Sequence, residues 1–204
     1  MEKEKLNRAW TDRQVRAIPQ EFKTREDGDD LIIEGYFAVF NSNYDIGYGM
    51  SESIAPGAFT NTISGDIRAL VNHDTTLVLG RTKAKTLELQ EDERGLWGRI
   101  RINPNDTAAM DLYNRVKRGD VDGCSFGFDI VDEETEFLEN GDIHWTIKEV
   151  VLYEVSCCTF PAYEQTNISA RSAQREEAIA RANEAWKEEM KRRLKHGTES
   201  ADEA

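Results

Sequence analysis

Residues 120–130 read Asp-Val-Asp-Gly-Cys-Ser-Phe-Gly-Phe-Asp-Ile, and this stretch is the most informative one in the chain. Its apolar residues alternate with small or polar ones, which indicates a β-strand with one face in the core. Ser125 lies on the other face, between Gly123 and Gly127. Because glycine weakens a strand interior, two glycines around one hydroxyl indicate that another backbone or a ligand comes close there. A bulged structural strand also explains the pattern, and no helix follows as it does in a nucleophile elbow.

The composition limits the classes of protein to consider. The chain has 204 residues, 39% of them apolar, which is enough for one domain with a core and extensions. No apolar run approaches the roughly 20 residues that cross a bilayer, and no signal segment is present, so we expect a cytoplasmic protein without membrane contact. The net charge of −13 opposes nucleic-acid binding. The three cysteines and three scattered histidines lack disulfide or zinc spacing, so we expect no metal and no cofactor.

Short apolar segments separated by turn residues predict a mostly β fold of the α+β class. Their spacing is typical of an antiparallel barrel or sandwich. Residues 41–51 and 132–142 are expected to be loop and turn. The expected strands are residues 14–22 and 31–40, joined by a turn, and then 66–72, 77–79, 86–89, 96–102, the Ser125 strand and 143–159.

Three segments have helical patterns. Pro56 could open a short helix that ends before Gly65. A helix of about a dozen residues is expected between the cap at Asp106 and Gly119. Residues 172–195 form an amphipathic pattern, whose apolar side consists of Ile179, Ala182, Trp186, Met190 and Leu194.

Two polar residues stand out beside apolar strands. His73 follows the strand at 66–72 and continues its apolar register, so it could reach a neighbouring strand. Glu154 shares its register with Val150 and Leu152. Burying a carboxylate without a partner is costly, so Glu154 must be hydrogen-bonded or lie where the sheet surface opens. A satisfied histidine and a structural salt bridge are the alternative explanations.

Four motifs occur in order between about Gly35 and Asn167. They are Glu52-Ser53-Ile54-Ala55-Pro56-Gly57-Ala58-Phe59; Leu70-Val71-Asn72-His73-Asp74 with Leu79-Gly80-Arg81; Gly123-Cys124-Ser125-Phe126-Gly127-Phe128; and Glu154-Val155-Ser156 with Thr159-Phe160-Pro161-Ala162. Together they resemble the caudovirus prohead serine proteases of the HK97 type. The resemblance implies a fold related to the herpesvirus assembly proteases, an antiparallel β-barrel surrounded by helices.

The resemblance also implies a role. A member of this family would be a serine endopeptidase that cleaves the scaffold region of the major capsid protein, and itself, inside the immature prohead in the host cytoplasm. Its partners would be the capsid protein and further copies of the chain, as in a dimer. We expect a flexible segment at 1–12, a protease domain at 13–170 and a charged amphipathic helix and tail at 171–204. Whether the tail is removed by self-cleavage is left open.

Carried over by motif, Ser125 is the expected nucleophile and His73 the base. A serine hydroxyl needs a histidine to take its proton, and the imidazole needs a third group to fix its tautomer. We expect Glu154 in this role, because an anion stabilises the imidazolium. Asp74 is a rival, although it would point to the opposite face if the strand continued. His144 begins the strand that ends in Glu154, about 33 Å away at about 3.3 Å per residue, so those two cannot serve one site.

The cysteines are the main departure from the family pattern, which has larger aliphatic residues there. We expect Cys124, Cys157 and Cys158 to be small core residues. Cys124 is an alternative nucleophile, but alternation points it into the face of Phe126 and Phe128. The alternative function is a non-catalytic scaffold or shell-interaction protein that keeps the fold and binds partners through its tail. A small-molecule esterase is a third hypothesis.

Overall fold

The computed structural model describes residues 14–19, 22–28, 30–160 and 165–199. The chain divides into two units, residues 1–164 and 165–204. The second unit contains one long helix, α2 (Gln165–Glu199), which begins before the helix expected from residue 172. None of the helices in the described ranges combines the length and the apolar composition that a bilayer span requires.

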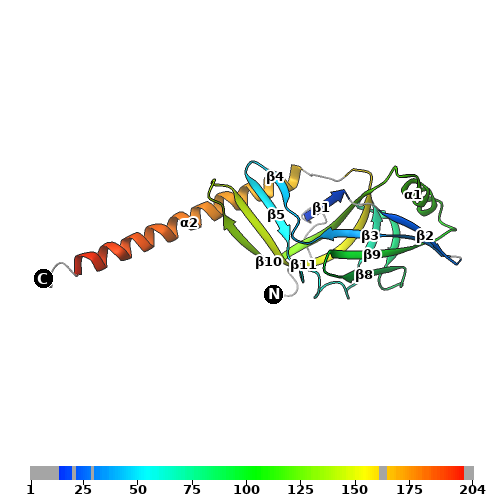
Figure 1. Cartoon of the computed structure of the whole chain (residues 1–204), viewed down its shortest axis with the longest axis horizontal. Coiled ribbons are helices and arrows are strands. Elements are labelled where there is room, and N and C mark those ends of the chain that lie inside the picture. Colours follow the sequence, from blue (N-terminus) through cyan, green and yellow to red (C-terminus); the bar gives the residue numbers. More distant parts are fainter. Residues whose placement is uncertain (1–13, 20–21, 29, 161–164, 200–204) are drawn as a thin grey trace. The chain divides into compact units, whose positions relative to one another are not determined.

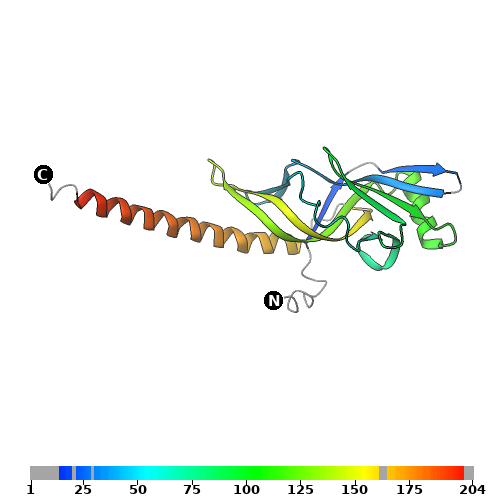
Figure 2. The same ribbon diagram turned by 90° about the horizontal axis from the view of Figure 1, so that it is seen from below.

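The first unit is built mainly of strands that form two sheets (Figure 1, with the same ribbon turned in Figure 2). The strands are β1 (Gln14–Pro19), β2 (Lys23–Asp27), β3 (Asp30–Val39), β4 (Tyr44–Gly47), β5 (Met50–Ile54), β6 (Arg68–Val71), β7 (Asp74–Arg81), β8 (Leu87–Glu91), β9 (Gly95–Ile102), β10 (Gly123–Phe137) and β11 (Ile143–Cys158). The larger sheet has the order β1-β10-β11-β5-β4, and β6 pairs with both β11 and β7. The smaller sheet has the order β2-β3-β9-β8.

This architecture confirms the expected mostly β class. Both strand orders are open at their ends among the described residues, so a closed barrel is not confirmed. The described part of the first unit contains one α-helix, α1 (Thr107–Arg118), rather than a surrounding set. This helix lies where the sequence predicts it, between the cap residues Asp106 and Gly119.

Several local expectations are wrong, because strand pairing overrides the local pattern. β1 does not form a hairpin with β3 but pairs with β10, and β2 supplies the hairpin partner instead. Residues 41–51 and 132–137 contain strands where the sequence predicts a loop and a turn, since β4, β5 and the outer half of β10 all find partners. Residues 56–64 form consecutive turns instead of a short helix.

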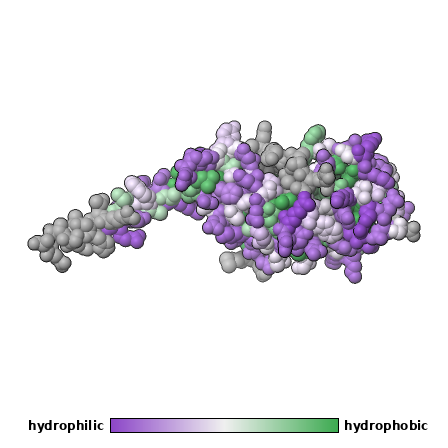
Figure 3. Space-filling model, in the orientation of Figure 1, coloured by the Kyte–Doolittle hydropathy of each residue, from purple (hydrophilic) through white to green (hydrophobic). Residues whose placement is uncertain are grey.

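The two sheets and α1 share one hydrophobic core. Its members include Ile33, Phe37 and Leu96 from the smaller sheet, Phe126, Phe128 and Val155 from the larger one, and Leu112 and Tyr113 from α1. The rings of Phe126 and Phe128 stack at 4.8 Å between centroids. The apolar face of β10 therefore lies in the core as predicted, while hydrophilic residues cover most of the surface that Figure 3 shows of this unit.

A one-residue β-bulge in β11 decides on which face Glu154 lies. Gly127 of β10 is opposite Glu154, but the next residue, Phe128, is opposite Leu152, so Tyr153 is an extra residue in β11. Leu152 packs in the core, and the bulge places Glu154 on the other face of the sheet. The register that the sequence predicts for Glu154 is therefore wrong, and its carboxylate lies on the glycine-containing face of β10.

Replacing Asp106 tests the N-terminal cap of α1. Its carboxylate accepts hydrogen bonds from the backbone N–H groups of Ala108 and Ala109, at 3.0 and 3.2 Å. We expect Asp106→Ala to lower the free energy of unfolding by about 1 kcal/mol in urea titrations, because both donors lose their acceptor. Asp111→Ala, which removes an exposed carboxylate from the same helix, is the matched control and should cost less than about 0.5 kcal/mol. Equal losses in the two variants would contradict the capping role.

Candidate active site

His73 lies in the two-residue turn that joins β6 to β7. Asn72 and His73 both have left-handed backbone conformations, with φ of 49° and 61°, and the flanking Val71 and Asp74 are paired. Non-glycine residues rarely adopt this conformation, although Asn, Asp and His do so more often than most. Such backbone strain concentrates at functional sites, and it points to a role for this imidazole.

Hydrogen bonds hold this turn against the end of β11. The backbone N–H of His73 donates to the hydroxyl of Ser156 at 3.2 Å. The backbone N–H of Asn72 donates to the carbonyl of Cys157 at 3.0 Å, and the side-chain oxygen of Asn72 accepts from the N–H of Thr159 at 3.0 Å. The position of the imidazole is therefore set by β11 as well as by its own hairpin.

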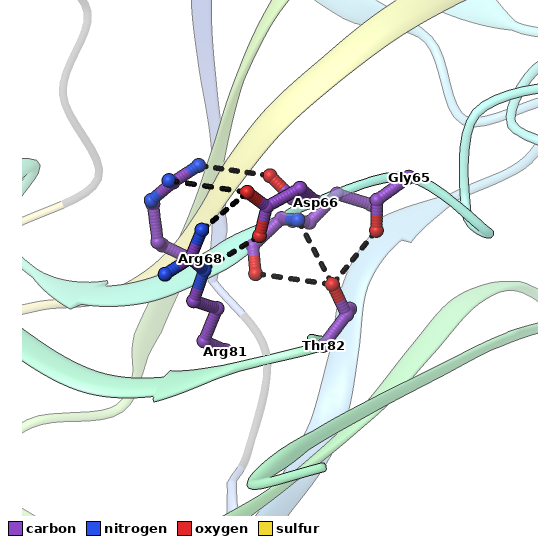
Figure 4. A network of polar contacts seen from close by, with 6 residues as sticks. Gly65, Asp66, Arg68, Arg81 and Thr82 are labelled. Atoms are coloured by element: carbon purple, nitrogen blue, oxygen red, sulfur yellow. Dashed lines mark hydrogen bonds and ion pairs between the residues drawn. The ribbon is translucent and has the colours of Figure 1, made fainter. Parts of the chain in front are cut away.

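A polar network fixes the opposite end of the β6–β7 hairpin (Figure 4). Both carboxylate oxygens of Asp66 accept from the guanidinium of Arg81, with 2.6 Å between Nε and Oδ1. The hydroxyl of Thr82 donates to the carbonyl of Gly65 at 2.7 Å and accepts from the backbone N–H of Ile67 at 3.0 Å. The hydrogen bond from Arg81 lowers the pKa of Asp66 to about 2, so this pair stays charged at neutral pH. The hairpin that presents His73 is thus anchored at both ends.

The carboxylate of Glu154 joins His73 to β11. Its Oε1 lies 2.7 Å from Nδ1 of His73, and its Oε2 accepts from the hydroxyl of Ser156 at 2.6 Å. Glu154 is only 3% exposed, so these bonds supply the partners that a buried carboxylate requires. The structure brings Glu154 and His73 together as the sequence suggests, and their chemical roles stay a prediction.

The position of Gly127 is explained by the same carboxylate. Gly127 is directly opposite Glu154 in the β10–β11 ladder. A Cβ atom at this position would lie 2.4 Å from Oε1 of Glu154, far closer than two unbonded atoms can approach. The group that comes close to the glycine-flanked strand is therefore the Glu154 side chain.

The surroundings of His73 change its protonation. Burial by itself lowers the pKa of His73. The hydrogen bonds to Cys158 and Glu154 and the charge of Glu154 outweigh this effect and raise the pKa from 6.5 to about 10. The imidazole is therefore protonated at neutral pH in this arrangement, and it forms an ion pair with the buried carboxylate.

Ser125 lies one strand away from these groups. It is directly opposite Ser156, and β11 separates it from β6, which leads to His73. Ser125 is fully buried, and its hydroxyl donates to the carbonyl of Arg16 on β1 at 2.8 Å. Among the described residues, no hydrogen bond joins Ser125 to the ring of His73. The structure places Ser125 near the site without forming the contact that nucleophilic catalysis needs.

Cys158 contacts the second nitrogen of the His73 imidazole. Its Sγ lies 3.7 Å from Nε2 of His73. All three cysteines are buried as expected, but Cys158 lies outside the core cluster that contains Cys124 and Cys157, and its contact with His73 was not predicted. The signal that could have found it is its spacing: Ser156 and Cys158 follow Glu154 at steps of two, which places all three on one face of a strand.

The other residues considered for the site are engaged elsewhere. The carboxylate of Asp74 accepts hydrogen bonds from the backbone N–H and the hydroxyl of Thr76, at 2.8 and 2.6 Å. His144 lies between Ser51 and Ser53, with its ring nitrogens 2.9 and 2.8 Å from the two hydroxyls. Both residues therefore have partners of their own outside the cluster described above.

Gly127→Ala tests the close approach of the Glu154 carboxylate to β10. The added methyl group must displace the carboxylate, so we expect a loss of about 1–3 kcal/mol in the free energy of unfolding, measured by urea titration. Glu154→Ala removes the obstacle, and the cost of Gly127→Ala should be smaller in that background. Strictly additive losses would show that the two residues do not compete for space.

The ion pair of His73 predicts a pH dependence of stability. Because the pKa of His73 is raised from 6.5 to about 10, its stabilisation is fully present below pH 6.5 and is lost as the pH rises towards 10. The difference in unfolding free energy between the unchanged protein and His73→Gln should therefore shrink across this window. His144→Gln is the matched control, since His144 contacts hydroxyls rather than a carboxylate. A difference that stays constant from pH 6.5 to 10 would rule out the ion pair.

Comparison with known proteins shows which family the chain belongs to. Residues 20–181 match the family described as caudovirus prohead serine protease. The prohead protease of Enterobacteria phage HK97 is 36% identical over 154 residues, which are 74% of this chain and 64% of the relative, so the chain spans just under two thirds of that protein's length. The bacteriophage T4 capsid assembly protease, a solved structure, aligns with a TM-score of 0.48 and 10% identity over 72% of this chain and 96% of its own. On the family match and the HK97 relative, the chain belongs to the caudovirus prohead serine protease family.

Proposed function

We propose that this chain is a serine endopeptidase in which Ser125 is the nucleophile, His73 the general base and Glu154 the group that orients His73. The observation that carries this proposal is the 2.7 Å contact between Nδ1 of His73 and Oε1 of Glu154, on the strand next to Ser125. The contact of Nδ1 with Glu154 would fix the tautomer of the imidazole and stabilise its positive charge during acyl transfer. Membership of a serine protease family supports the same reaction class.

Peptide hydrolysis would proceed in two stages. The Oγ atom of Ser125 attacks the carbonyl carbon of the substrate while Nε2 of His73 takes the hydroxyl proton. The C–N bond then breaks, and the proton passes to the leaving amine. Water that loses a proton to His73 next releases the acyl group from Ser125. Backbone N–H groups are the expected donors to the oxyanion.

Two rearrangements would convert the observed arrangement into a reactive one. The side chain of Ser125 has to rotate from the carbonyl of Arg16 towards β11, and the thiol of Cys158 has to leave Nε2 of His73. Loss of the thiol contact also removes one of the interactions that raise the pKa of His73, which favours the neutral imidazole that a base requires. Catalytic hydrogen bonds are often incomplete before a substrate binds.

The proposed substrate is the scaffold region of the phage major capsid protein, with the chain itself as a second substrate. The support is the relative from phage HK97, which is named a prohead protease. Cleavage would occur inside the immature prohead in the host cytoplasm, where copies of the chain could pair. A barrel related to the herpesvirus assembly proteases belongs to the same proposal, as does the division into residues 1–12, 13–170 and 171–204.

Co-expression with the capsid protein tests the reaction. We expect the unchanged chain to shorten the capsid protein on a gel, and Ser125→Ala or His73→Ala to reduce the rate of processing by at least about 1000-fold. Glu154→Gln should also slow processing, because the imidazole loses its anionic partner. His144→Ala, which alters a histidine outside the site, is the control and should leave processing intact. Capsid protein that is still cut with Ser125→Ala would contradict the assignment.

The contact of Cys158 with His73 favours one second candidate, a cysteine endopeptidase. In the structure it is this thiol, rather than the hydroxyl of Ser125, that lies next to Nε2 of His73. Cys158→Val separates the two mechanisms when it is compared with Ser125→Ala. Processing that survives the first substitution and not the second identifies the serine as the nucleophile, and the reverse result identifies the cysteine.

A non-catalytic scaffold or shell-interaction protein is the remaining alternative. It predicts no processing of the capsid protein by any variant. It also predicts altered shell assembly when Trp186 of α2, whose side chain is exposed, is replaced. Normal processing together with normal assembly in the Trp186 variant would exclude it.

A further inference from the structure

β1 is an extended strand that lies directly beside Ser125. It pairs antiparallel with β10, and Ala17 is directly opposite Ser125. The Ser125 hydroxyl donates to the carbonyl oxygen of Arg16 at 2.8 Å. The strand order β1, β10, β11, β6 places this carbonyl on one side of Ser125 and His73 on the other. Acyl transfer requires such an order, with the hydroxyl between the carbonyl and the base.

The side chain of Arg16 is held by a buried carboxylate. Its Nε and Nη2 atoms donate to the two carboxylate oxygens of Glu52, with 2.7 Å between Nη2 and Oε2. Glu52 is fully buried, Arg16 is 7% exposed, and the ring of Phe128 lies 5.6 Å from the guanidinium carbon. A carboxylate that accepts hydrogen bonds through both oxygens, next to the face of an aromatic ring, selects a guanidinium group. We call Glu52 and Phe128 together the guanidinium site.

The position of β1 in the fold permits its exchange. β1 is the terminal strand in the order of its sheet. It ends at Pro19, and the match to the protease family begins at residue 20, so β1 lies outside the matched region. A terminal strand can be replaced by another extended segment while the remaining strand pairs stay intact, which is how peptides add to sheet edges.

We propose that Arg16 is a built-in substrate mimic, and that the guanidinium site selects an arginine side chain on the acyl side of the bond to be cut. The substrate would be an extended basic segment that pairs with β10 in place of β1 and brings its carbonyl carbon to Ser125. β1 would then compete with the substrate in cis. This inference rests on the proposed function, because the site acts on specificity only if Ser125 is the nucleophile.

A purely structural ion pair is the competing explanation. Burying two charges costs much of the energy that their attraction returns, so such a pair adds little stability over well-packed apolar residues. Removing one partner is nevertheless destabilising, because the other charge stays buried. A structural role therefore predicts lower stability in Arg16 variants and no change in what the protein binds.

Two peptidyl diphenyl phosphonates distinguish these explanations in the full-length protein. One carries a guanidine side chain and the other an uncharged norleucine side chain. In each reaction a bond forms between Oγ of Ser125 and phosphorus, and one phenol leaves with the hydroxyl proton. Intact mass spectrometry over time gives the labelling rate, and Ser125→Ala identifies labelling that depends on the nucleophile.

We expect the guanidine probe to label faster than the norleucine probe by about tenfold or more, the size of one charge-assisted hydrogen bond. Arg16→Ala should label faster than the unchanged chain, because the competing side chain is gone. Glu52→Gln should reduce the preference for guanidine. Arg25→Ala and Glu88→Gln, which alter exposed residues on β2 and β8, are the matched controls and should behave like the unchanged chain.

Three results would overturn the inference. They are equal labelling by both probes, no gain in rate with Arg16→Ala, and a guanidine preference that persists in folded Glu52→Gln. Thermal unfolding establishes which variants are folded, and if the buried substitutions prevent folding, the ratio of the two probes on the unchanged chain decides alone. If neither probe labels the protein in a way that depends on Ser125, that result would contradict the proposed function instead.

The capsid protein offers a second readout. N-terminal sequencing of its processed fragment gives the residue that precedes the cut. We expect that residue to be arginine. A cut after any residue other than arginine would overturn the proposed specificity while leaving the peptidase activity established.

Discussion

The buried carboxylate of Glu154 is the group on which the rest of the site depends. One oxygen contacts the imidazole of His73 and the other accepts from the hydroxyl of Ser156, whose oxygen in turn accepts from the backbone of His73. Gly127 leaves the space that this carboxylate fills. One side chain of β11 therefore contacts both the β6–β7 turn and the glycine-flanked part of β10, which are far apart in the sequence.

The energetic demands on this group explain the residues around it. A buried carboxylate needs hydrogen bonds and a compensating charge, and the raised pKa of His73 shows that the imidazole supplies that charge at neutral pH. The same interactions oppose the proposed role of His73 as a base, because a protonated imidazole cannot accept a proton. The contact of Cys158 with Nε2 strengthens this resting condition. Stability and reactivity thus make opposite demands on one histidine, as is common where strained or paired groups serve an active site.

How much could be read from the sequence differs from element to element. Alternation identified the core face of β10, and cap residues located α1, because both signals are local. The family motifs indicated that His73 and Glu154 lie close together, and the structure shows this contact. The partner of β1 was not predictable, because strand pairing across a hundred residues leaves no local pattern. The contact of Cys158 with His73 was not predicted, because the sequence indicates only a small buried residue there.

The bulge at Tyr153 limits how the sequence of β11 can change during evolution. In most of a strand, a conservative exchange of one side chain alters one contact. Here side chains alternate between the two faces of the strand, so that Val155 and Cys157 lie in the apolar interior and Glu154 and Ser156 on the polar face. Losing one residue before Glu154 would exchange these two sets at once, burying the carboxylate in hydrocarbon and exposing valine. In this segment the count of residues is as constrained as their identity, so divergence should proceed by substitution and hardly ever by insertion or deletion.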